Sequence, residues 1–280
     1  MQPQATSKVW FITGISSGLG KALVEEVAES GDYAVGTFRN LEQVEDFNNP
    51  PKERAFAVKL DITQPGEIEQ AVETVLARWG RIDVLVNNAG FGFAGAVEEA
   101  SAQELREVLE TNFFGVFYVT QCVLPALRRQ RSGHIIQISS HNGFRGSPGF
   151  GIYNASKFAV EGMSEALAAE VAPLGIKLTI VEPGPLRTNF AGNAFREAER
   201  IIEDYATTAG AFRTRIKQID GKQEGHPQKA AKAILQIASV ENPPLRLPLG
   251  KIAVATLNSK LSGVQKDLEA WTGLAESAVY

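Results

Sequence analysis

Tyr153 and Lys157 stand four positions apart and carry the side chains of an acid–base pair. On a helix, residues at this spacing lie on one face, and their side chains can reach a common point. A free phenol has a pKa of about 10, and a neighbouring ammonium favours the phenolate, each pKa unit being worth roughly 1.4 kcal/mol. The pair could move a proton to or from an oxygen atom of a bound molecule, although such pairs also arise by chance on surface helices.

Ser140 lies thirteen positions before Tyr153 and follows the apolar run 134–139, which predicts a buried strand. Its hydroxyl could donate a hydrogen bond to an oxygen on which negative charge develops. Ser139 and His141 flank it, but side chains alternate along a strand and should point elsewhere, so a serine hydrolase is not predicted. His141 could still touch a substrate.

The segment TGISSGLG (13–20) follows the apolar run VWFIT (9–13) and precedes a helical pattern. Glycines allow a tight turn and a close approach to a phosphate, and free N–H groups at a helix start bind anions. Glycine-rich turns also occur for steric reasons alone, so this segment by itself is a moderate signal. The residues expected to hold a phosphate-bearing cofactor are Gly14, Ser16, Ser17, Gly18, Leu19 and Gly20.

Short apolar runs rich in β-branched residues alternate with longer helical patterns, which predicts a series of βαβ units. Strands are expected at 9–13, 33–37, 55–60, 83–87, 134–139, 178–182 and 244–250, and helices at about 19–30, 65–79, 102–131, 152–173, 226–240 and 251–272. Because the strands are almost continuously apolar, helices should cover both faces of a parallel sheet. The predicted fold class is α/β, with a doubly wound parallel sheet.

A single domain is expected to span residues 1–280. The stretch at about 185–225 breaks the alternation with scattered aromatics, charges and glycines, so we predict a lobe that covers the substrate. Residues 251–272 should form a closing helical tail.

The composition disfavours several classes of protein. A net charge of −4 without a dense basic run argues against nucleic acid as a partner and favours a small molecule. One cysteine, Cys122, and three histidines make a metal site held by protein ligands unexpected. No run reaches the ~18 apolar residues needed to span a bilayer, so we expect a cytoplasmic protein without membrane contact.

The order of these motifs resembles that of the classical short-chain dehydrogenase/reductase (SDR) family. Over roughly residues 8–190 the order is TGxxxGxG, Asp61, the Asn87-Asn88-Ala89-Gly90 run, Asn112, Ser140, Tyr153 with Lys157, and Pro183-Gly184. The resemblance implies a Rossmann-type sheet of about seven strands, a nicotinamide cofactor, and interconversion of a ketone or aldehyde and its alcohol. It also implies Tyr153 as general acid/base, Ser140 as a donor to the substrate oxygen, and Lys157 as a partner of the nicotinamide ribose.

The same resemblance assigns further residues to the site. Asp61 would lie beside the adenine with Ile62 flanking it, although Asp61 could instead cap a helix. Asn112 would hold a water that links Lys157 to solvent, its alternative role being a kink in the helix. The remaining implied cofactor contacts are Asn88, Ala89 and Gly90 after the fourth strand, and Pro183, Gly184, Leu186 and Thr188 after the sixth.

The end of the second predicted strand indicates the cofactor. In dinucleotide folds a carboxylate there favours a free ribose 2′-hydroxyl, whereas a cation favours a 2′-phosphate. Here the segment runs Gly36-Thr37-Phe38-Arg39-Asn40, without an acid. Arg39 could bind a phosphate with its planar fork of donors, so we expect NADP(H), with NAD(H) as the second possibility. The alternative for Arg39 is a solvated surface side chain.

Aromatic residues near the motifs predict a bulky, hydrophobic carbonyl substrate. The expected pocket residues are Phe91, Phe93, His141 and Phe190, and a lid could add Phe195, Ile201, Ile202, Tyr205 and Phe212. Each of these side chains could equally pack the lobe against the core.

Two other functions remain open at this point: an NAD(H)-preferring dehydrogenase of the same fold, and a protein that senses nicotinamide nucleotides without catalysis. The intact Tyr153 and Lys157 pair favours an enzyme. By family resemblance, the long helices at 102–131 and 152–173 would join copies of the chain into a homodimer or homotetramer.

Overall fold

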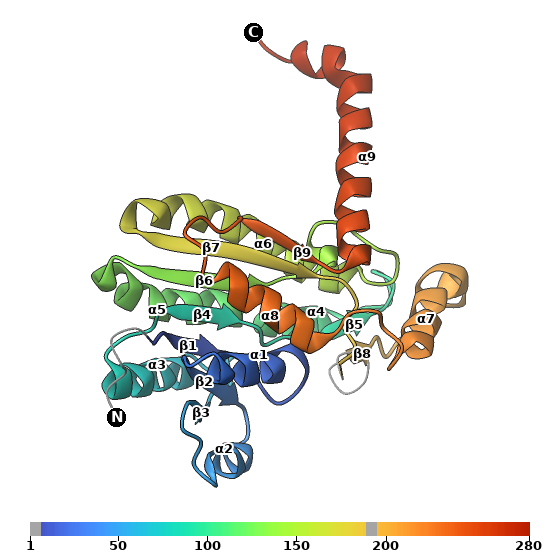
Figure 1. The fold of residues 1–280 in the computed structure, drawn as a ribbon. Helices are drawn as coiled ribbons and strands as arrows, with labels where there is room; N and C mark the ends of the chain where they lie inside the picture. The colour runs from blue at the N-terminus through green and yellow to red at the C-terminus, as the bar shows by residue number, and fades with distance from the viewer. Residues whose placement is uncertain (1–6, 189–194) are drawn as a thin grey trace.

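Parallel strands form the central sheet of the computed structural model, which describes residues 7–188 and 195–280 (Figure 1). Within these residues the sheet has seven strands in the order β3-β2-β1-β4-β6-β7-β9. Their bounds are β1 Val9–Ile12, β2 Tyr33–Phe38, β3 Ala55–Lys59, β4 Val84–Asn87, β6 Gly133–Ile138, β7 Ile176–Pro183 and β9 Arg246–Leu249. The strand order reverses between β1 and β4, and ligands of open α/β sheets bind outside the carboxyl ends of the strands at such a switch point.

Different helices cover the two faces of the sheet. One face carries α3 (Pro65–Trp79), α5 (Val116–Gln130) and α6 (Gly151–Val171), and the other carries α1 (Gly18–Glu29), α2 (Leu41–Asn48) and α8 (Pro227–Ile237). Val75, Val123 and Leu167 belong to the first core, and Leu23 and Ile234 to the second. The predicted doubly wound α/β fold is confirmed.

The pattern at 102–131 predicts one helix, but the structure divides it. Ser101 and Glu104 form a capping box at the start of α4 (Ala102–Leu109). A wider π-helical turn (η1, Glu110–Gly115) follows and leads into α5. Such a turn fits a residue whose side chain bonds outside its own helix, as Asn112 does here.

The stretch after β7 forms elements that the sequence pattern does not reveal. The short strand β8 (Phe195–Glu197) pairs in parallel with β5 (Gly92–Ala94), apart from the main sheet. The helix α7 (Ala211–Ile219) then runs beside them. Arg213 of α7 forms a buried ion pair with Glu99, which follows β5 by a few residues (Nη1–Oε2 2.5 Å). These contacts fasten the described part of the lobe to β5 and to the segment that follows it.

The last helix, α9 (Lys251–Glu276), projects away from the rest of the molecule (Figure 1). It extends four residues beyond the predicted end of the tail. Only Ala253 and Leu257 in its first two turns are buried. Among the described residues, no helix is both long and apolar enough to cross a membrane.

Candidate active site

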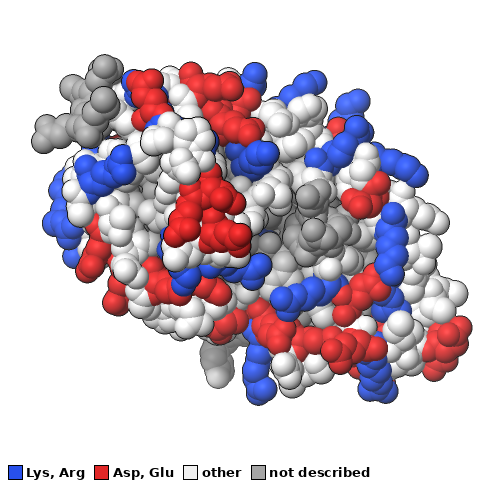
Figure 2. Space-filling view, turned by 90° about the horizontal axis from the view of Figure 1, so that it is seen from below, with Lys and Arg blue, Asp and Glu red and all other residues white. Residues whose placement is uncertain are grey.

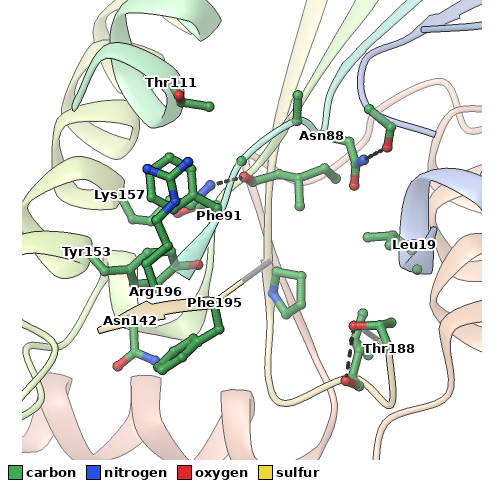
Figure 3. A pocket seen from close by; sticks show the side chains of 18 of the residues that line it. Leu19, Asn88, Phe91, Thr111, Asn142, Tyr153, Lys157, Thr188, Phe195 and Arg196 are labelled. Carbon is green, nitrogen blue, oxygen red and sulfur yellow. Dashed lines mark hydrogen bonds between the residues drawn. The ribbon is translucent and has the colours of Figure 1, made fainter. Parts of the chain in front are cut away.

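A cavity of about 1350 Å³ opens at the carboxyl ends of the central strands. It extends from the glycine loop after β1, past the ends of β4 and β6, to α6 and α7. Most of the residues singled out in the sequence come together here, although they are up to about 170 positions apart along the chain. Figure 3 shows part of the lining, with Tyr153 and Lys157 on one side and Leu19 and Thr188 on the other.

The glycine loop has the backbone geometry of a phosphate cradle. Gly14 adopts a φ of +71°, in the left-handed region, and a Cβ there would lie 2.9 Å from the Cα of Ala89. Ser17 caps α1 without a side-chain hydrogen bond. The first N–H groups of α1 therefore keep their donor capacity for an anion, as a pyrophosphate would require. Gly14, Ser16, Ser17, Gly18 and Leu19 line the cavity, whereas Gly20 packs behind it against Asn88.

The run after β4 fixes the shape of this loop. The Asn88 amide donates to the carbonyl oxygens of Thr13 (3.0 Å) and Gly14 (2.8 Å). The Thr13 hydroxyl in turn accepts the backbone N–H groups of Asn88 and Ala89. Asn88, Ala89 and Gly90 all line the cavity, and the Asn88 side chain also ties two strand ends together.

The far end of the cavity lies at the end of β2 and β3. Arg39 is exposed there and lines the cavity. Asp61 also lines it, and its carboxylate accepts from the N–H (3.0 Å) and hydroxyl (2.8 Å) of Thr63. The alternative prediction of a helix cap is wrong, because α3 has Gln64 at its cap position. Ile62 is buried and lines the cavity beside it. An exposed cation without a neighbouring acid on β2 fits a 2′-phosphate.

The residues after β7 border the same cavity from another side. Pro183, Gly184, Leu186 and Thr188 all line it. Thr188 lies against Gly18, since a Cβ on that glycine would come within 3.2 Å of the threonine Cβ. The segment therefore closes over the glycine loop, where it can contact a bound dinucleotide.

Tyr153 stands at the inner wall of the cavity with only 5% of its surface exposed. Its ring stacks on Phe150, with ring centroids 4.2 Å apart. Burial raises the pKa of Tyr153 well above its ordinary value, and a hydrogen bond with the Ser140 side chain acts in the opposite direction. Ser140 is buried next to the phenol, and its hydroxyl also accepts the N–H of Asn142 (3.1 Å). Ser139 and His141 line the cavity, so the prediction that these two neighbours point elsewhere is wrong.

Lys157 lies one turn along α6, and its ammonium is 5.9 Å from the Tyr153 ring centroid. Its Nζ donates to the carbonyl oxygen of Ile138 at the end of β6 (2.9 Å). Burial lowers the pKa of Lys157 to about 8, and the charge of Glu161 acts to raise it. At Tyr153 desolvation outweighs the hydrogen bond with Ser140, so the net shift of the phenol pKa is upward and not downward, as the pairing with an ammonium alone would predict.

Asn112 is fully buried in the π-helical turn. Its Oδ1 accepts the N–H of Phe91 (3.0 Å), and its Nδ2 donates to the carbonyl oxygen of Phe91 (2.9 Å) and to the Ser156 hydroxyl (3.2 Å). The side chain thus holds the run after β4 against α6, close to Lys157. The predicted change in the helix at Asn112 fits this position, and the predicted water link from Asn112 to Lys157 stays a prediction.

The predicted substrate residues divide into three groups. Phe91, His141, Phe195 and Phe212 line the cavity. Phe93 instead packs in a small core with Val108, Ile152 and Ala198, while Ile201 is 66% exposed and the Tyr205 hydroxyl donates to Glu98. Phe190 lies outside the described residues. Phe91 and His141 lie in the connections after β4 and β6, Phe195 begins β8 and Phe212 belongs to α7, whereas Phe93 points inward at the centre of β5.

Several lining residues have no signal in the sequence. They come from the connection before α6, from β8 and from α7, and they are Arg145, Phe150, Arg196, Arg215 and Ile216. The spacing of Phe150, three positions before Tyr153, could have suggested a contact at the start of the helix. No local pattern identifies the others, since their places depend on how α7 and β8 fold back.

Comparisons with known proteins agree with this site. Residues 8–199 match the model of the short chain dehydrogenase family. An oxidoreductase of Botryotinia fuckeliana is 40% identical over 270 residues, covering 96% of this chain and 98% of that protein. A 3-ketodihydrosphingosine reductase of Bacteroides thetaiotaomicron is 42% identical over 255 residues, covering 90% of each.

Solved structures with the same fold extend the comparison. A short-chain dehydrogenase from Streptomyces avermitilis superposes with a TM-score of 0.92 and 42% identity, covering 98% of this chain and 100% of that one. ElxO with NADP bound has a TM-score of 0.74 and 25% identity, over 89% and 100% of the chains. The family match covers well over half of the chain, and we conclude that this protein belongs to the short-chain dehydrogenase family and is an oxidoreductase that uses a nicotinamide cofactor.

Proposed function

We propose that the protein is an NADP(H)-dependent reductase that interconverts a bulky, hydrophobic ketone or aldehyde and its alcohol, with Tyr153 as the general acid/base. The observation that carries the proposal is the buried Tyr153, bonded to Ser140, in the cavity that also contains the glycine loop. A proton donor and a dinucleotide cradle in one cavity are what carbonyl reduction requires.

The chemistry divides between the cofactor and the chain. When bound, the nicotinamide supplies or accepts the hydride. Ser140 donates a hydrogen bond to the substrate oxygen, and Tyr153 gives that oxygen its proton in reduction and takes it back in oxidation. Because burial keeps the pKa of Tyr153 high, the phenol is protonated at neutral pH, as reduction needs. Lys157 keeps a positive charge beside the phenol, and its ammonium is a hydrogen-bond donor for the nicotinamide ribose.

The proposed preference for NADP(H) rests on Arg39. It is the cation at the end of β2, it lines the cavity, and no acid accompanies it in the Phe38-Arg39-Asn40 segment. A guanidinium pairs well with a phosphate through two parallel hydrogen bonds. An NAD(H)-preferring dehydrogenase is the alternative, and structures of this fold carry either cofactor.

The proposed substrate class rests on the inner part of the cavity. Its wall is aromatic or aliphatic over Phe91, Phe150, Phe195, Phe212 and Ile216. A pocket with an apolar wall and a few convergent polar groups is suited to a largely hydrophobic ligand. A 3-ketodihydrosphingosine reductase and a retinol dehydrogenase are among the relatives, which supports a carbonyl or alcohol substrate.

The proposed setting is a cytoplasmic homodimer or homotetramer without nucleic-acid or membrane partners. Phe114, Phe117 and Phe158 on the η1–α5 and α6 surfaces are about 40% exposed, as the family-type interface would require. Figure 2 shows basic and acidic side chains intermixed on the face viewed, which supports a small-molecule partner over nucleic acid.

The proposal is tested with Tyr153→Phe, which removes the proton donor and keeps the ring stacked on Phe150. NADPH consumption with a panel of ketones should fall by about 10²–10⁴-fold in kcat, the usual contribution of a general acid. NADPH affinity, followed by nucleotide fluorescence, should stay unchanged. Equal turnover by the two proteins would reject the assigned mechanism, and nucleotide binding without turnover by the native chain would favour a sensing protein.

A further inference from the structure

The helix α9 exposes an apolar surface that the molecule itself does not cover. Within the described residues, the hydrogen bonds between α9 and the rest of the protein involve Ile252 and Thr256, in its first two turns. Leu261, Val264, Leu268 and Trp271 are then 49–64% exposed. We call Val254, Leu257, Leu261, Val264, Leu268, Trp271 and Ala275 the α9 stripe.

The α9 stripe has the spacing of a coiled coil. Its members alternate in steps of three and four residues over three heptads, from Val254 to Ala275. Hydrophobic residues at this repeat form a seam that packs into the seam of another helix. Figure 1 shows that the helix rises out from the body and that its last turns bend aside, so a second helix can lie along the part before the bend.

A helix of this kind needs a partner. A single helix shorter than about 12–15 residues is marginal in water, and longer ones gain most of their stability from packing an apolar face. The part of α9 beyond Leu257 has no such packing in this chain. This part carries two basic and three acidic side chains, which are Lys260, Lys266, Asp267, Glu269 and Glu276. A membrane-surface helix would carry an excess of basic residues on its polar face, so this one favours a protein partner.

We propose that the α9 stripe pairs antiparallel with the α9 stripe of a second copy of this chain. An antiparallel pair places the two globular bodies at opposite ends of the paired helices. In the proposed register, Leu261 of each chain lies beside Val264 of the other chain. The same register brings Trp271 of each chain to Val254 of the other. Val254 is 45% exposed and Trp271 64%, so both have surface to bury.

The charges beside the stripe select this register. Lys260 and Asp267 each precede a stripe residue and occupy equivalent flanking positions one heptad apart. In the proposed register, Lys260 of each copy lies next to Asp267 of the other, which gives two attractive pairs. A slip of one heptad in either direction instead brings Lys260 against Lys260 or Asp267 against Asp267. Like charges at such positions disfavour a pairing, so electrostatics favours the proposed register over both slipped ones.

This interface is separate from the proposed η1–α5 and α6 faces, and it does not depend on the proposed reaction. Sedimentation velocity of the full chain gives the mass of the particle and so tests whether two α9 stripes pair. Leu261→Glu should remove one association step, halving the mass of the particle, while the rate of ketone reduction per chain stays within about twofold. Lys266→Glu, on the opposite side of α9, is the matched control and should leave the mass unchanged.

The register is tested by charge reversal at low ionic strength, where screening is weakest. Lys260→Asp or Asp267→Lys alone should weaken the association roughly tenfold, since two attractive pairs become repulsive. The double variant Lys260→Asp/Asp267→Lys should restore it. A parallel pairing would show no such rescue and would overturn the antiparallel arrangement.

Two results would overturn the proposal as a whole. One is a native chain whose mass does not change with Leu261→Glu. The other is flotation of the native chain, but not of Leu261→Glu, with phosphatidylcholine vesicles while both remain the same size in solution. The second result would assign the stripe to a lipid surface.

Discussion

At the scale of single residues, burial controls the acid–base pair more strongly than the neighbouring charge does. Desolvation raises the pKa of Tyr153 and lowers that of Lys157 to about 8. Tyrosine is neutral when protonated and lysine is charged, so the same buried environment moves the two pKa values in opposite directions and apart from each other. The phenol is thereby kept as an acid, and the ammonium becomes the group that titrates near physiological pH.

The pH dependence of kcat/KM for ketone reduction follows from these directions. Both groups are protonated below about pH 8, and Lys157 loses its charge as the pH rises through that value. Because kcat/KM reports ionisations of the free enzyme, it should fall above about pH 8. Lys157→Arg, which stays charged, should move this fall to higher pH at whatever rate the variant retains. An unchanged profile in that variant would assign the titration to another group.

Cofactor choice is also a residue-scale property in the proposed function. Arg39→Asp replaces the cation at the end of β2 with an acid. Loss of a charge-assisted hydrogen bond is worth about 1.5–3 kcal/mol, so kcat/KM for NADPH should fall roughly 10–100-fold. The kcat/KM for NADH should stay the same or rise. Arg78→Asp, on α3 against Phe56, is a charge-matched control and should leave the ratio unchanged.

At the scale of elements, the segment 195–219 keeps its place over the cavity through contacts distant in sequence. The buried Glu99 accepts from Arg213 of α7 and from the N–H groups of Ala96 and Ile202. The hydrogen bond from Arg213 is the main cause that lowers the pKa of Glu99 to about 2. The carboxylate thus stays charged and joins β5, α7 and the connection between them.

Glu99→Gln should release this segment. It leaves the buried Arg213 without its counter-charge, and breaking a buried pair costs on the order of 3 kcal/mol. We expect faster proteolysis within 195–219 and a higher KM for bulky ketones, with little change for small ones. The exposed Glu203→Gln on the same segment is the control. Unaltered proteolysis of Glu99→Gln would show that the ion pair does not hold the segment.

At the scale of the whole molecule, the sheet buries a histidine whose protonation opposes folding. His134 on β6 is 4% exposed, and its Nε2 lies 3.0 Å from the Thr179 hydroxyl on β7. Burial is the main cause that lowers the pKa of His134 to about 4. The folded chain therefore keeps this ring neutral at a pH where the unfolded chain would protonate it.

Acid should destabilise the protein in a defined range. Between about pH 6.5 and 4 the unfolded state binds a proton at His134 that the folded state does not, so stability falls as the pH falls. The loss approaches ~3 kcal/mol over this range. Urea unfolding at pH 7 and pH 4.5 should show a smaller difference in His134→Gln, which keeps a polar partner for Thr179. An equal difference in both proteins would place the acid sensitivity elsewhere.

The sequence by itself determined the features that depend on neighbours along the chain. Apolar runs and helical periods predicted the main strands and most helices because buried strands and amphipathic helices repeat locally. Glycines 14–20 predicted a turn into a helix, and the spacing of Tyr153 and Lys157 predicted one shared helix face. These inferences need only backbone geometry over a few residues.

The tertiary structure alone decided what depends on distant partners. The strand β8 exists only because β5, about 100 positions earlier, offers an edge to it. Arg215 and Ile216 reach the cavity, and Phe93 does not, because of how α7 and β5 pack. Burial likewise set the pKa values of Tyr153 and Lys157, since desolvation depends on every atom packed around a group and not on its neighbours in sequence.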